Sequence, residues 1–305
     1  MLDIFFLDKT LKRVSIEEVR PGRMVWVDAS NLAKGEQEWL TTTFSLHPLT
    51  AEDIYNSHVR VKVEQFPGYL FSVFYAINEK KLDQTEVDFV LGKNFLITNH
   101  SSHSELFKKA KEDNTSVNSL DFLFHKLLDS VVDSNLLALE AADDIIESLE
   151  EEAISSTDQK ILVRIMAMKR KIARLRKTAL SQRDKISFLA KQDYPQISKR
   201  AIPYFRDIYD HSIRVSDSLE NHREALGNVY DVYVSTISNR MNEVMKTLSI
   251  IATIALPLGI ISGIYGTNFI RLPGSSAEAG FWYMIGGMAL LVFGMLVYFR
   301  KRHWF

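Results

Sequence analysis

The chain has 305 residues, 46% of them hydrophobic and 25% charged, and carries a formal net charge of -1. This balance gives no indication of nucleic-acid binding, and the lack of cysteine in the sequence excludes disulfides, cysteine-ligated zinc, iron–sulfur clusters and thiol catalysis. The average composition is that of an ordinary soluble protein. Any membrane segment must therefore be found from where the apolar residues lie along the chain.

Residues 1–118 predict a cytoplasmic α/β domain. Short runs rich in β-branched and aromatic residues are bounded by turn residues, which is typical of strands. The expected strands are 24–27, 69–77, 87–91 and 95–98. Between the last two, the sequence Gly-Lys-Asn predicts a hairpin turn.

The same region contains two signals for short helices. Ser15 with Glu18, and Thr50 with Asp53, each fit the spacing of a capping box. The N-terminal residues lack a basic segment followed by a long apolar stretch, so we expect no cleavable signal peptide. The part of the chain that precedes the apolar C-terminal region is therefore expected to stay in the cytoplasm.

Residues 119–202 predict a helical hairpin. Apolar residues recur there at steps of three and four, as the buried face of a helix requires. Acidic residues are concentrated at 143–152 and basic residues at 164–176, with turn-forming residues at 155–158 between them. A solvated pair of antiparallel helices is the favoured interpretation, and an acidic helix that attracts cations is the alternative.

Residues 203–247 predict a stalk helix that continues into a membrane. Residues 193–195 break the preceding helical pattern, and Pro203 suits the first turn of a new helix. No loop-like cluster interrupts the chain from Tyr204 to Tyr265. At 1.5 Å per residue, such a helix is roughly 90 Å long. It needs lateral partners to bury its apolar face, and copies of the same chain are the expected partners.

Two uncharged stretches, 248–266 and 280–299, are each long enough to cross a membrane. They predict two transmembrane helices joined by an extracytoplasmic loop at 267–279. Two spans return the C-terminus to the side on which the N-terminus lies, and the basic tail at 300–305 agrees with the positive-inside tendency. The charges of this tail are Arg300, Lys301 and Arg302.

One face of the first span carries small, flexible or amide-bearing side chains at helical spacing. Its members are Asn242, Met245, Leu248 or Ser249, Ala252, Leu256, Gly259 and Gly263. Such a face lines a pore or lets helices pack closely in the membrane, and composition alone leaves both interpretations open.

A motif at the outer end of this span is more specific. From Tyr265 the sequence reads Tyr-Gly-Thr-Asn-Phe, which strongly resembles the Tyr-Gly-Met-Asn-Phe signature of the CorA family. Three further segments resemble that family in the same order. Residues 47–64 are similar to its cytoplasmic domain, 203–211 to the start of its stalk helix and 238–254 to its pore helix.

The resemblance covers nearly the whole chain and implies an α+β fold. The implied parts are a cytoplasmic α/β/α domain, a long helical stalk and two C-terminal transmembrane helices, assembled as a funnel-shaped homopentamer around one axial pore. The implied function is a divalent-cation channel for Mg²⁺, with Co²⁺ and Ni²⁺ as substitutes. It would mediate uptake across the inner (plasma) membrane under the control of intracellular Mg²⁺.

The resemblance also implies roles for single residues. Gly266, Thr267 and Asn268 correspond to a selectivity filter in which amides accept hydrogen bonds from the waters of a hydrated ion. An alternative is that Asn268 only caps the helix. The implied gate, in which a ring of apolar side chains closes the pore by dewetting, comprises Met245, Leu248 and Leu256, with Asn242 as a polar ring and Gly259 in place of a common hydroxyl residue.

Asp207 matches the stalk carboxylate that shares a regulatory cation with an acidic residue of a neighbouring subunit in the family. Glu79 or Asp83 is the expected partner, because two close carboxylates repel each other unless a cation lies between them. An exposed carboxylate near the start of the helix is the alternative for Asp207.

The chain departs from the family signature at Thr267, where methionine is usual. This difference keeps Zn²⁺ transport of the ZntB type as the second hypothesis. A third is a membrane anchor or metal-sensing receptor with two spans. No phosphate-binding loop, nucleophile elbow or zinc-protease motif is present, so an enzyme is not expected.

Overall fold

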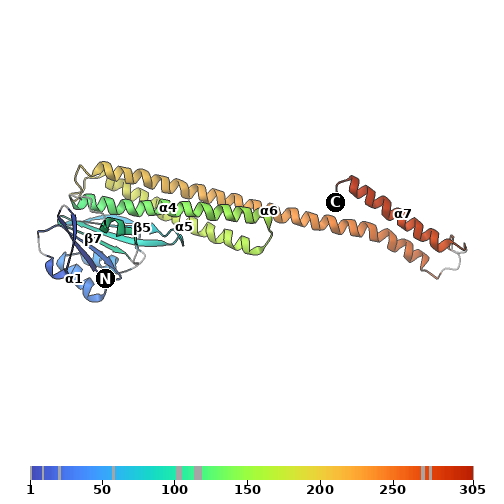
Figure 1. Cartoon of the computed structure of the whole chain (residues 1–305), viewed down its shortest axis with the longest axis horizontal. Helices are drawn as coiled ribbons and strands as arrows, with labels where there is room; N and C mark the ends of the chain where they lie inside the picture. Colours follow the sequence, from blue (N-terminus) through green and yellow to red (C-terminus); the bar gives the residue numbers. More distant parts are fainter. Residues whose placement is uncertain are drawn as a thin grey trace. The chain divides into compact units, whose positions relative to one another are not determined.

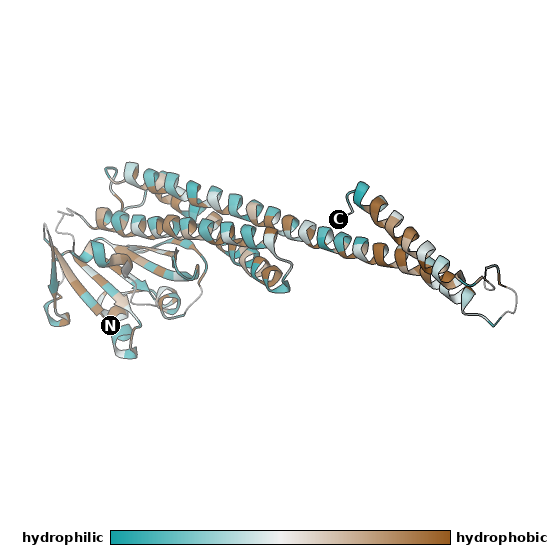
Figure 2. Ribbon diagram, turned by 45° about the vertical axis from the view of Figure 1, so that its right-hand side comes forward, coloured by the Kyte–Doolittle hydropathy of each residue, from teal (hydrophilic) through white to brown (hydrophobic). Residues whose placement is uncertain are grey.

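The computed structural model describes residues 2–8, 10–19, 22–56, 59–100, 105–112, 119–268, 272–274 and 277–304. The chain forms two compact units. The first consists of Met1–Glu152 and Asp158–Tyr230, and contains the sheet and the helices packed on it. The second consists of Ala153–Thr157 and Asp231–Phe305, and contains the most apolar helical segments (Figures 1 and 2).

The first unit is built on a seven-stranded sheet with the strand order β2-β1-β3-β7-β6-β5-β4. The strands β3 and β7 pair in parallel, and the other neighbours are antiparallel. The strands are β1 (Leu2–Asp8), β2 (Thr10–Val14), β3 (Val25–Ser30), β4 (Lys62–Phe66), β5 (Tyr69–Ile77), β6 (Gln84–Gly92) and β7 (Phe95–His100).

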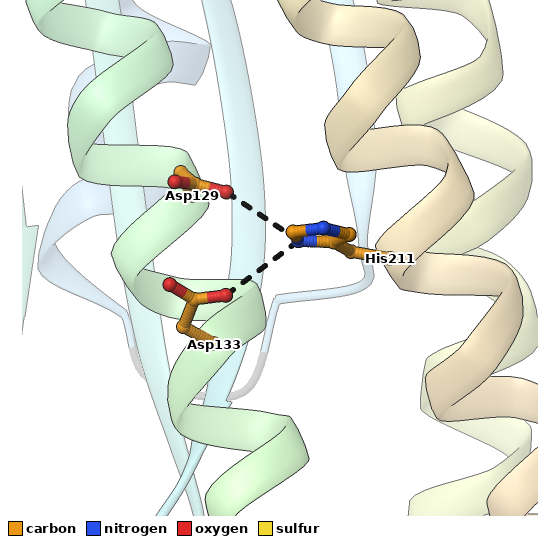
Figure 3. A group of neighbouring side chains, drawn as sticks. All are labelled: Asp129, Asp133 and His211. Carbon is orange, nitrogen blue, oxygen red and sulfur yellow. Dashed lines mark ion pairs between the residues drawn. The ribbon is translucent and has the colours of Figure 1, made fainter.

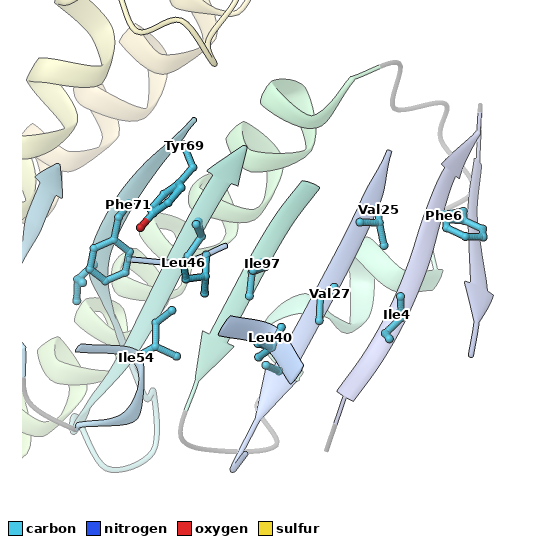
Figure 4. Packing of buried hydrophobic residues seen from close by; sticks show 13 residues of the cluster. Ile4, Phe6, Val25, Val27, Leu40, Leu46, Ile54, Tyr69, Phe71 and Ile97 are labelled. Atoms are coloured by element: carbon cyan, nitrogen blue, oxygen red, sulfur yellow. The ribbon is translucent and has the colours of Figure 1, made fainter. Parts of the chain in front are cut away.

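One face of the sheet packs on the short helices α1 (Lys34–Thr43) and α2 (Pro48–Tyr55). Alternate residues of each strand point to this face. Figure 4 shows the resulting core, in which Val27 and Ile97 of the sheet lie with Leu40 of α1. These three side chains are fully buried.

The opposite face is covered by α3 (Lys108–Glu112) and α4 (Leu120–Ser155). The ring of Phe89 on β6 lies 6.2 Å from that of Phe107 and 5.2 Å from that of Phe124 on α4, in edge-to-face geometry. Helices on both faces make the three-layer α/β/α arrangement that the resemblance implied.

The helical hairpin consists of α4 and α5 (Gln159–Lys191). Asp158 caps α5, because its carboxylate accepts the amide hydrogen of Lys160 at 2.9 Å. Across the turn, Arg164 and Glu152 form an ion pair between exposed side chains. Two helices thus occupy the region of the predicted hairpin, and this exposed pair fits a solvated surface.

The four predicted strands are confirmed as β3, β5, β6 and β7, and the predicted turn joins β6 to β7. A Cβ atom on Gly92 would lie 2.2 Å from Cε1 of Phe95, so a larger residue at this position would force the Phe95 ring to shift. The sequence prediction missed β1, β2 and β4.

The capping box expected at Thr50 is wrong. The helix α2 begins two residues earlier, at Pro48, and its cap is His47, whose Nδ1 accepts the amide hydrogen of Leu49 at 3.2 Å. Thr50 is instead buried, and its hydroxyl lies 2.8 Å from that of Tyr69. At the other expected cap, the amide of Ser15 donates to Glu18 at 3.0 Å, at the start of a short 3-10 helix.

The long helix α6 spans Ile202–Tyr265 without interruption and contains Pro257. The last helix, α7, spans Gly280–Lys301. Both helices contain a stretch long and apolar enough to cross a membrane, and the side chains of these stretches are not buried within the chain. Figure 2 shows the hydrophobic colouring concentrated on α7 and on the last part of α6.

Candidate functional site

The small-residue face of α6 lies open in the single chain. Met245, Leu248 and Leu256 are 57%, 58% and 63% exposed, respectively. Asn242 and Gly259 are also exposed. Apolar side chains at this exposure are not part of the chain's own core, so they face lipid or another molecule.

A different face of α6 is partly covered. Its half-buried residues recur at helical steps: Lys246, Ile250, Ile254, Pro257, Leu258 and Ile261. A matching stripe on α7 consists of Met284, Met288, Leu291, Met295 and Phe299. Both views show α7 running back beside the last part of α6 (Figures 1 and 2). At 3.6 residues per turn, the covered stripe of α6 lies roughly opposite the small-residue face. The second helix therefore leaves that face free.

The motif follows directly on the end of α6. The amide of Gly266 donates to the carbonyl of Ser262 at 2.8 Å, and the amide of Thr267 to that of Ile264 at 3.3 Å. The Thr267 hydroxyl donates to the same Ile264 carbonyl at 2.7 Å. These bonds close the helix end without Asn268, whose side chain is exposed and makes no hydrogen bond among the described residues. The capping interpretation of Asn268 is therefore not supported by this geometry.

The basic tail lies at the opposite end of α7. Arg300 and Lys301 occupy its last turn and Arg302 follows as the C-cap. The ammonium group of Lys246 on α6 donates to the carbonyl oxygen of His303 at 2.9 Å. The positive charges of both helices are thus gathered at one end of the apolar pair, as expected beside a membrane surface.

A second group of functional side chains lies in the first unit, between α4 and α6. Nδ1 of His211 lies 3.7 Å from Oδ1 of Asp129 and 3.6 Å from Oδ1 of Asp133 (Figure 3). Nε2 of the same ring lies 4.0 Å from Oδ2 of Asp207, one turn earlier on α6. Two carboxylates and one imidazole offer ligand atoms within 4.8 Å of one another.

The electrostatics of this group favour a positive ligand. Burial and the neighbouring Asp133 raise the pKa of the Asp129 carboxyl, His211 opposes this, and Asp207 adds to it. Oδ1 of Asp129 and Nδ1 of His211 are buried without a hydrogen-bond partner among the described residues. Oxygen and imidazole ligands of this kind suit a divalent cation. Burial also lowers the pKa of the nearby His125.

The remaining predicted metal ligands lie elsewhere. Asp83 pairs with Lys171 on α5 at 3.7 Å, and Glu79 is exposed in the loop between β5 and β6. Among the described residues, neither makes an ion pair with Asp207. The sequence prediction missed Asp129, Asp133 and His211, although the four-residue spacing of the two aspartates on a predicted helix was a usable signal.

Comparison with known proteins gives concordant results. A family model described as CorA-like Mg²⁺ transporter protein matches residues 21–301. The cobalt/magnesium transport protein CorA of Thermotoga maritima is 35% identical over 311 residues, covering 97% of this chain and 89% of that protein. The putative metal ion transporter YfjQ of Bacillus subtilis is 30% identical over 302 residues, covering 97% and 95%.

Among solved structures, the complete CorA magnesium transporter from Methanocaldococcus jannaschii superposes with a TM-score of 0.87. The match covers 100% of this chain and 99% of that chain, at 20% sequence identity. At this identity the likeness establishes the fold, including the sheet domain, the long helix and the two apolar C-terminal helices.

Proposed function

The chain belongs to the CorA-like Mg²⁺ transporter family, and from this premise we propose that it conducts divalent cations across a membrane, with Mg²⁺ as the main substrate. Co²⁺ and Ni²⁺ are expected to substitute for it. The observation that carries the proposal is the exposed small-residue face of α6, which is continuous with the Gly-Thr-Asn motif and free of α7.

Five copies of the chain are proposed to enclose the pathway. Because α7 lies on the opposite side of α6, the exposed small-residue face has no covering partner within the chain, and copies of the same helix are its fitting partners. We propose that the five faces surround one axis. A native mass spectrum with five times the 35.0 kDa mass of the chain would support this assembly, whereas any other copy number would contradict it.

At the outer end we propose a filter of Gly266, Thr267 and Asn268. Mg²⁺ gives up its water reluctantly, so a ring of neutral amides that bind the hydrated ion favours entry without dehydration. The Asn268 side chain supports this role because it is exposed and not used by the helix end.

Along the pathway we propose that Met245, Leu248 and Leu256 form an apolar constriction. Asn242 would add a polar ring, and Gly259 would leave the pathway wide. Rings of apolar side chains close a channel by excluding water, without contact to the ion. The open position of these side chains in the single chain supports the proposal.

For regulation we propose that intracellular Mg²⁺ binds at Asp207 and at the neighbouring group of Asp129, Asp133 and His211. The residues fit a cation because their oxygens and ring nitrogen converge and two of these atoms have no hydrogen-bond partner among the described residues. An acidic side chain of a neighbouring copy, Glu79 or Asp83, is the proposed further ligand. Bound cation would hold the subunits together and favour the closed channel.

The location proposed for the chain is the inner (plasma) membrane, with both termini in the cytoplasm. The basic residues Arg300, Lys301 and Arg302 at the end of α7, together with Lys246, support this orientation. The remaining membrane contacts would be to lipid.

Zn²⁺ transport is the second candidate. The observation that favours it is Thr267, which stands where the family signature has methionine. An experiment with purified protein in liposomes separates the candidates. With an inside-negative potential and a Mg²⁺ gradient, we expect Mg²⁺ uptake that Co²⁺ and Ni²⁺ inhibit by competition. Uptake of Zn²⁺ without Mg²⁺ uptake would support the second candidate, and no metal uptake would indicate an anchor or receptor.

A further inference from the structure

A polar cavity opens at one end of the sheet, on the face that carries α1 and α2. Every second residue of β6 points to this face of the sheet. The side chains at these positions are apolar at the buried Val90 but acidic at Asp88 and Glu86. On β7 the same face changes from Ile97, which is labelled in Figure 4, to Asn99. The cavity at this transition has a volume of about 410 Å³. Pockets for small organic molecules typically measure about 300–1,000 Å³.

The wall of the cavity is rich in hydrogen-bond acceptors and contains two carboxyl groups. It includes the carboxylates of Asp88 and Glu86, and the side-chain amides of Asn31, Asn56 and Gln84 are among its other polar groups. Neither lysine nor arginine belongs to this wall in the part of the chain that the structure describes. His100 also lines the cavity, but its Nε2 already lies 3.3 Å from Oδ1 of Asp28, so the wall does not favour an anionic ligand.

Asp88 is the unusual group in this wall. It is 2% exposed. One carboxylate oxygen accepts a hydrogen bond from the Asn99 amide at 2.8 Å, whereas the other is buried and has no partner among the described residues. A buried carboxylate oxygen without a hydrogen-bond partner destabilises the folded chain, because the free energy of removing that atom from water is not offset.

The charged groups around Asp88 do not offset the cost of burying its ionised carboxylate. Burial raises the pKa of this carboxyl well above its usual range; the hydrogen bond from Asn99 opposes the change, and Glu86 and Asp53 add to it. Lys62 acts in the opposite direction, but it is ion-paired with Asp53. A cation placed in the cavity would favour the ionised carboxylate.

We propose that this cavity binds a small aliphatic ammonium ion, with Asp88 as its counter-ion and neighbouring amide oxygens as acceptors for its remaining hydrogens. An ammonium group has three donors and no acceptor, which matches a wall of carboxylate and carbonyl oxygens. A directly ligated metal fits less well, because the described carboxylates and histidines converge in threes only at Asp129, Asp133 and His211. The inference is independent of the proposed transport activity.

The test uses the full-length protein in detergent micelles and radiolabelled putrescine as the probe. We expect saturable binding at one site per chain at about pH 7.5. Asp88→Asn keeps the shape of the side chain but removes its charge, and should weaken binding by at least about tenfold. Asp184→Asn is the matched control, because Asp184 is an exposed carboxylate on α5 that pairs with its neighbour Arg183. It should bind putrescine as the unmodified chain does.

Two further measurements keep the test decisive. The Asp88→Asn variant should melt at or above the temperature of the unmodified chain, which excludes misfolding as the cause of lost binding. The bis-quaternary analogue 1,4-bis(trimethylammonio)butane carries the same two positive charges as putrescine but has no N–H donor, so it should not displace putrescine. The proposal would be overturned if the quaternary ammonium compound displaced putrescine as well as unlabelled putrescine does. It would also be overturned if the unmodified chain showed no saturable putrescine binding, or if Asp88→Asn bound putrescine as tightly as the unmodified chain. Mg²⁺ binding that depends on Asp88, without putrescine binding, would identify a metal site instead.

Discussion

The side-chain amide of Asn135 on α4 takes the place of a neighbouring strand beside Ile77 at the end of β5. Its Oδ1 atom accepts the amide hydrogen of Ile77 at 2.7 Å, and its Nδ2 atom donates to the carbonyl of Tyr75 at 3.2 Å. The pairing of β4 with β5 reaches only to Val73. Asn135, which is 2% exposed, therefore satisfies backbone groups that would otherwise be buried and unpaired.

Replacing this amide should destabilise the first unit. Asn135→Ala leaves the Ile77 amide without its acceptor, which costs about 1–3 kcal/mol for a buried group. Denaturant unfolding of the purified protein, followed by circular dichroism, measures the change. Glu140→Ala, at an exposed position of the same helix, should change the free energy of unfolding by no more than about 0.5 kcal/mol. Equal effects of both substitutions would refute this role for Asn135.

The proposed filter predicts that Asn268→Ala abolishes Mg²⁺ uptake and leaves the oligomer intact, because the amide acts on the hydrated ion and not on the fold. Uptake into liposomes and native mass spectrometry measure the two properties. Asn228→Ala removes an exposed amide from the part of α6 that lies in the first unit, and should leave uptake unchanged. Retained uptake in Asn268→Ala would argue against the amide ring.

The proposed constriction predicts that Leu248→Asn increases basal flux, because a polar side chain keeps water in a pathway that apolar side chains would empty. Leu248→Met has nearly the same volume and should keep the pathway closed. Uptake is compared at high internal Mg²⁺, where the unmodified channel is expected to be closed. If Leu248→Asn is as tightly closed as Leu248→Met, the gate lies elsewhere.

The proposed regulatory site predicts that Asp207→Lys weakens the inhibition of uptake by internal Mg²⁺, since an ammonium group replaces a ligand and repels the cation. The measurement is uptake against internal Mg²⁺ concentration. Glu224→Lys makes the same charge change at an exposed position farther along α6. Its inhibition curve should match that of the unmodified chain. An unshifted curve for Asp207→Lys would remove this residue from the sensor.

The raised pKa of the Asp88 carboxyl predicts that the stability of the folded chain depends on pH. Its folded pKa is raised, so the folded chain holds this proton more tightly than the unfolded chain does. The stabilisation is complete below the ordinary value of 3.8 and is lost as the pH rises through the folded pKa. Near pH 7 and without amines, Asp88→Asn should raise the melting temperature of the chain, because the substitution removes the unfavourable ionisation of this buried carboxyl. Near pH 4 the two proteins should melt at similar temperatures. A gain of equal size at both pH values would exclude titration of Asp88 as its cause.

The sequence predicted correctly those elements whose signals lie within one short segment of the chain. It failed where an element depends on contacts with distant residues. The strands β5 and β6 were predicted because their apolar runs are bounded by turns. The missed β4 is an edge strand whose residues Glu64 and Gln65 are exposed, so it lacks that signal. The cap of α2 was misplaced because Thr50 hydrogen-bonds to Tyr69, a contact with a distant residue.

The candidate sites were likewise predictable only where their residues lie on one segment of the chain. The small-residue face was predictable because all its members lie on α6, where spacing alone defines a face. The group of Asp129, Asp133 and His211 joins two helices, so its formation depends on how α4 packs on α6. The cavity at Asp88 depends on the register of three strands, which no single segment reveals.

The position of the sheet domain before the apolar helices matters for biosynthesis. The ribosome completes the seven strands and their covering helices before it makes the first apolar stretch of α6. Because domains generally fold as units during synthesis, we expect the insertion machinery to receive a chain that already carries a folded, water-exposed body. Such a body does not pass through a narrow translocation channel. In the orientation proposed above, this body would remain on the ribosome's side of the bilayer, and the order of synthesis would set the direction in which the two helices insert.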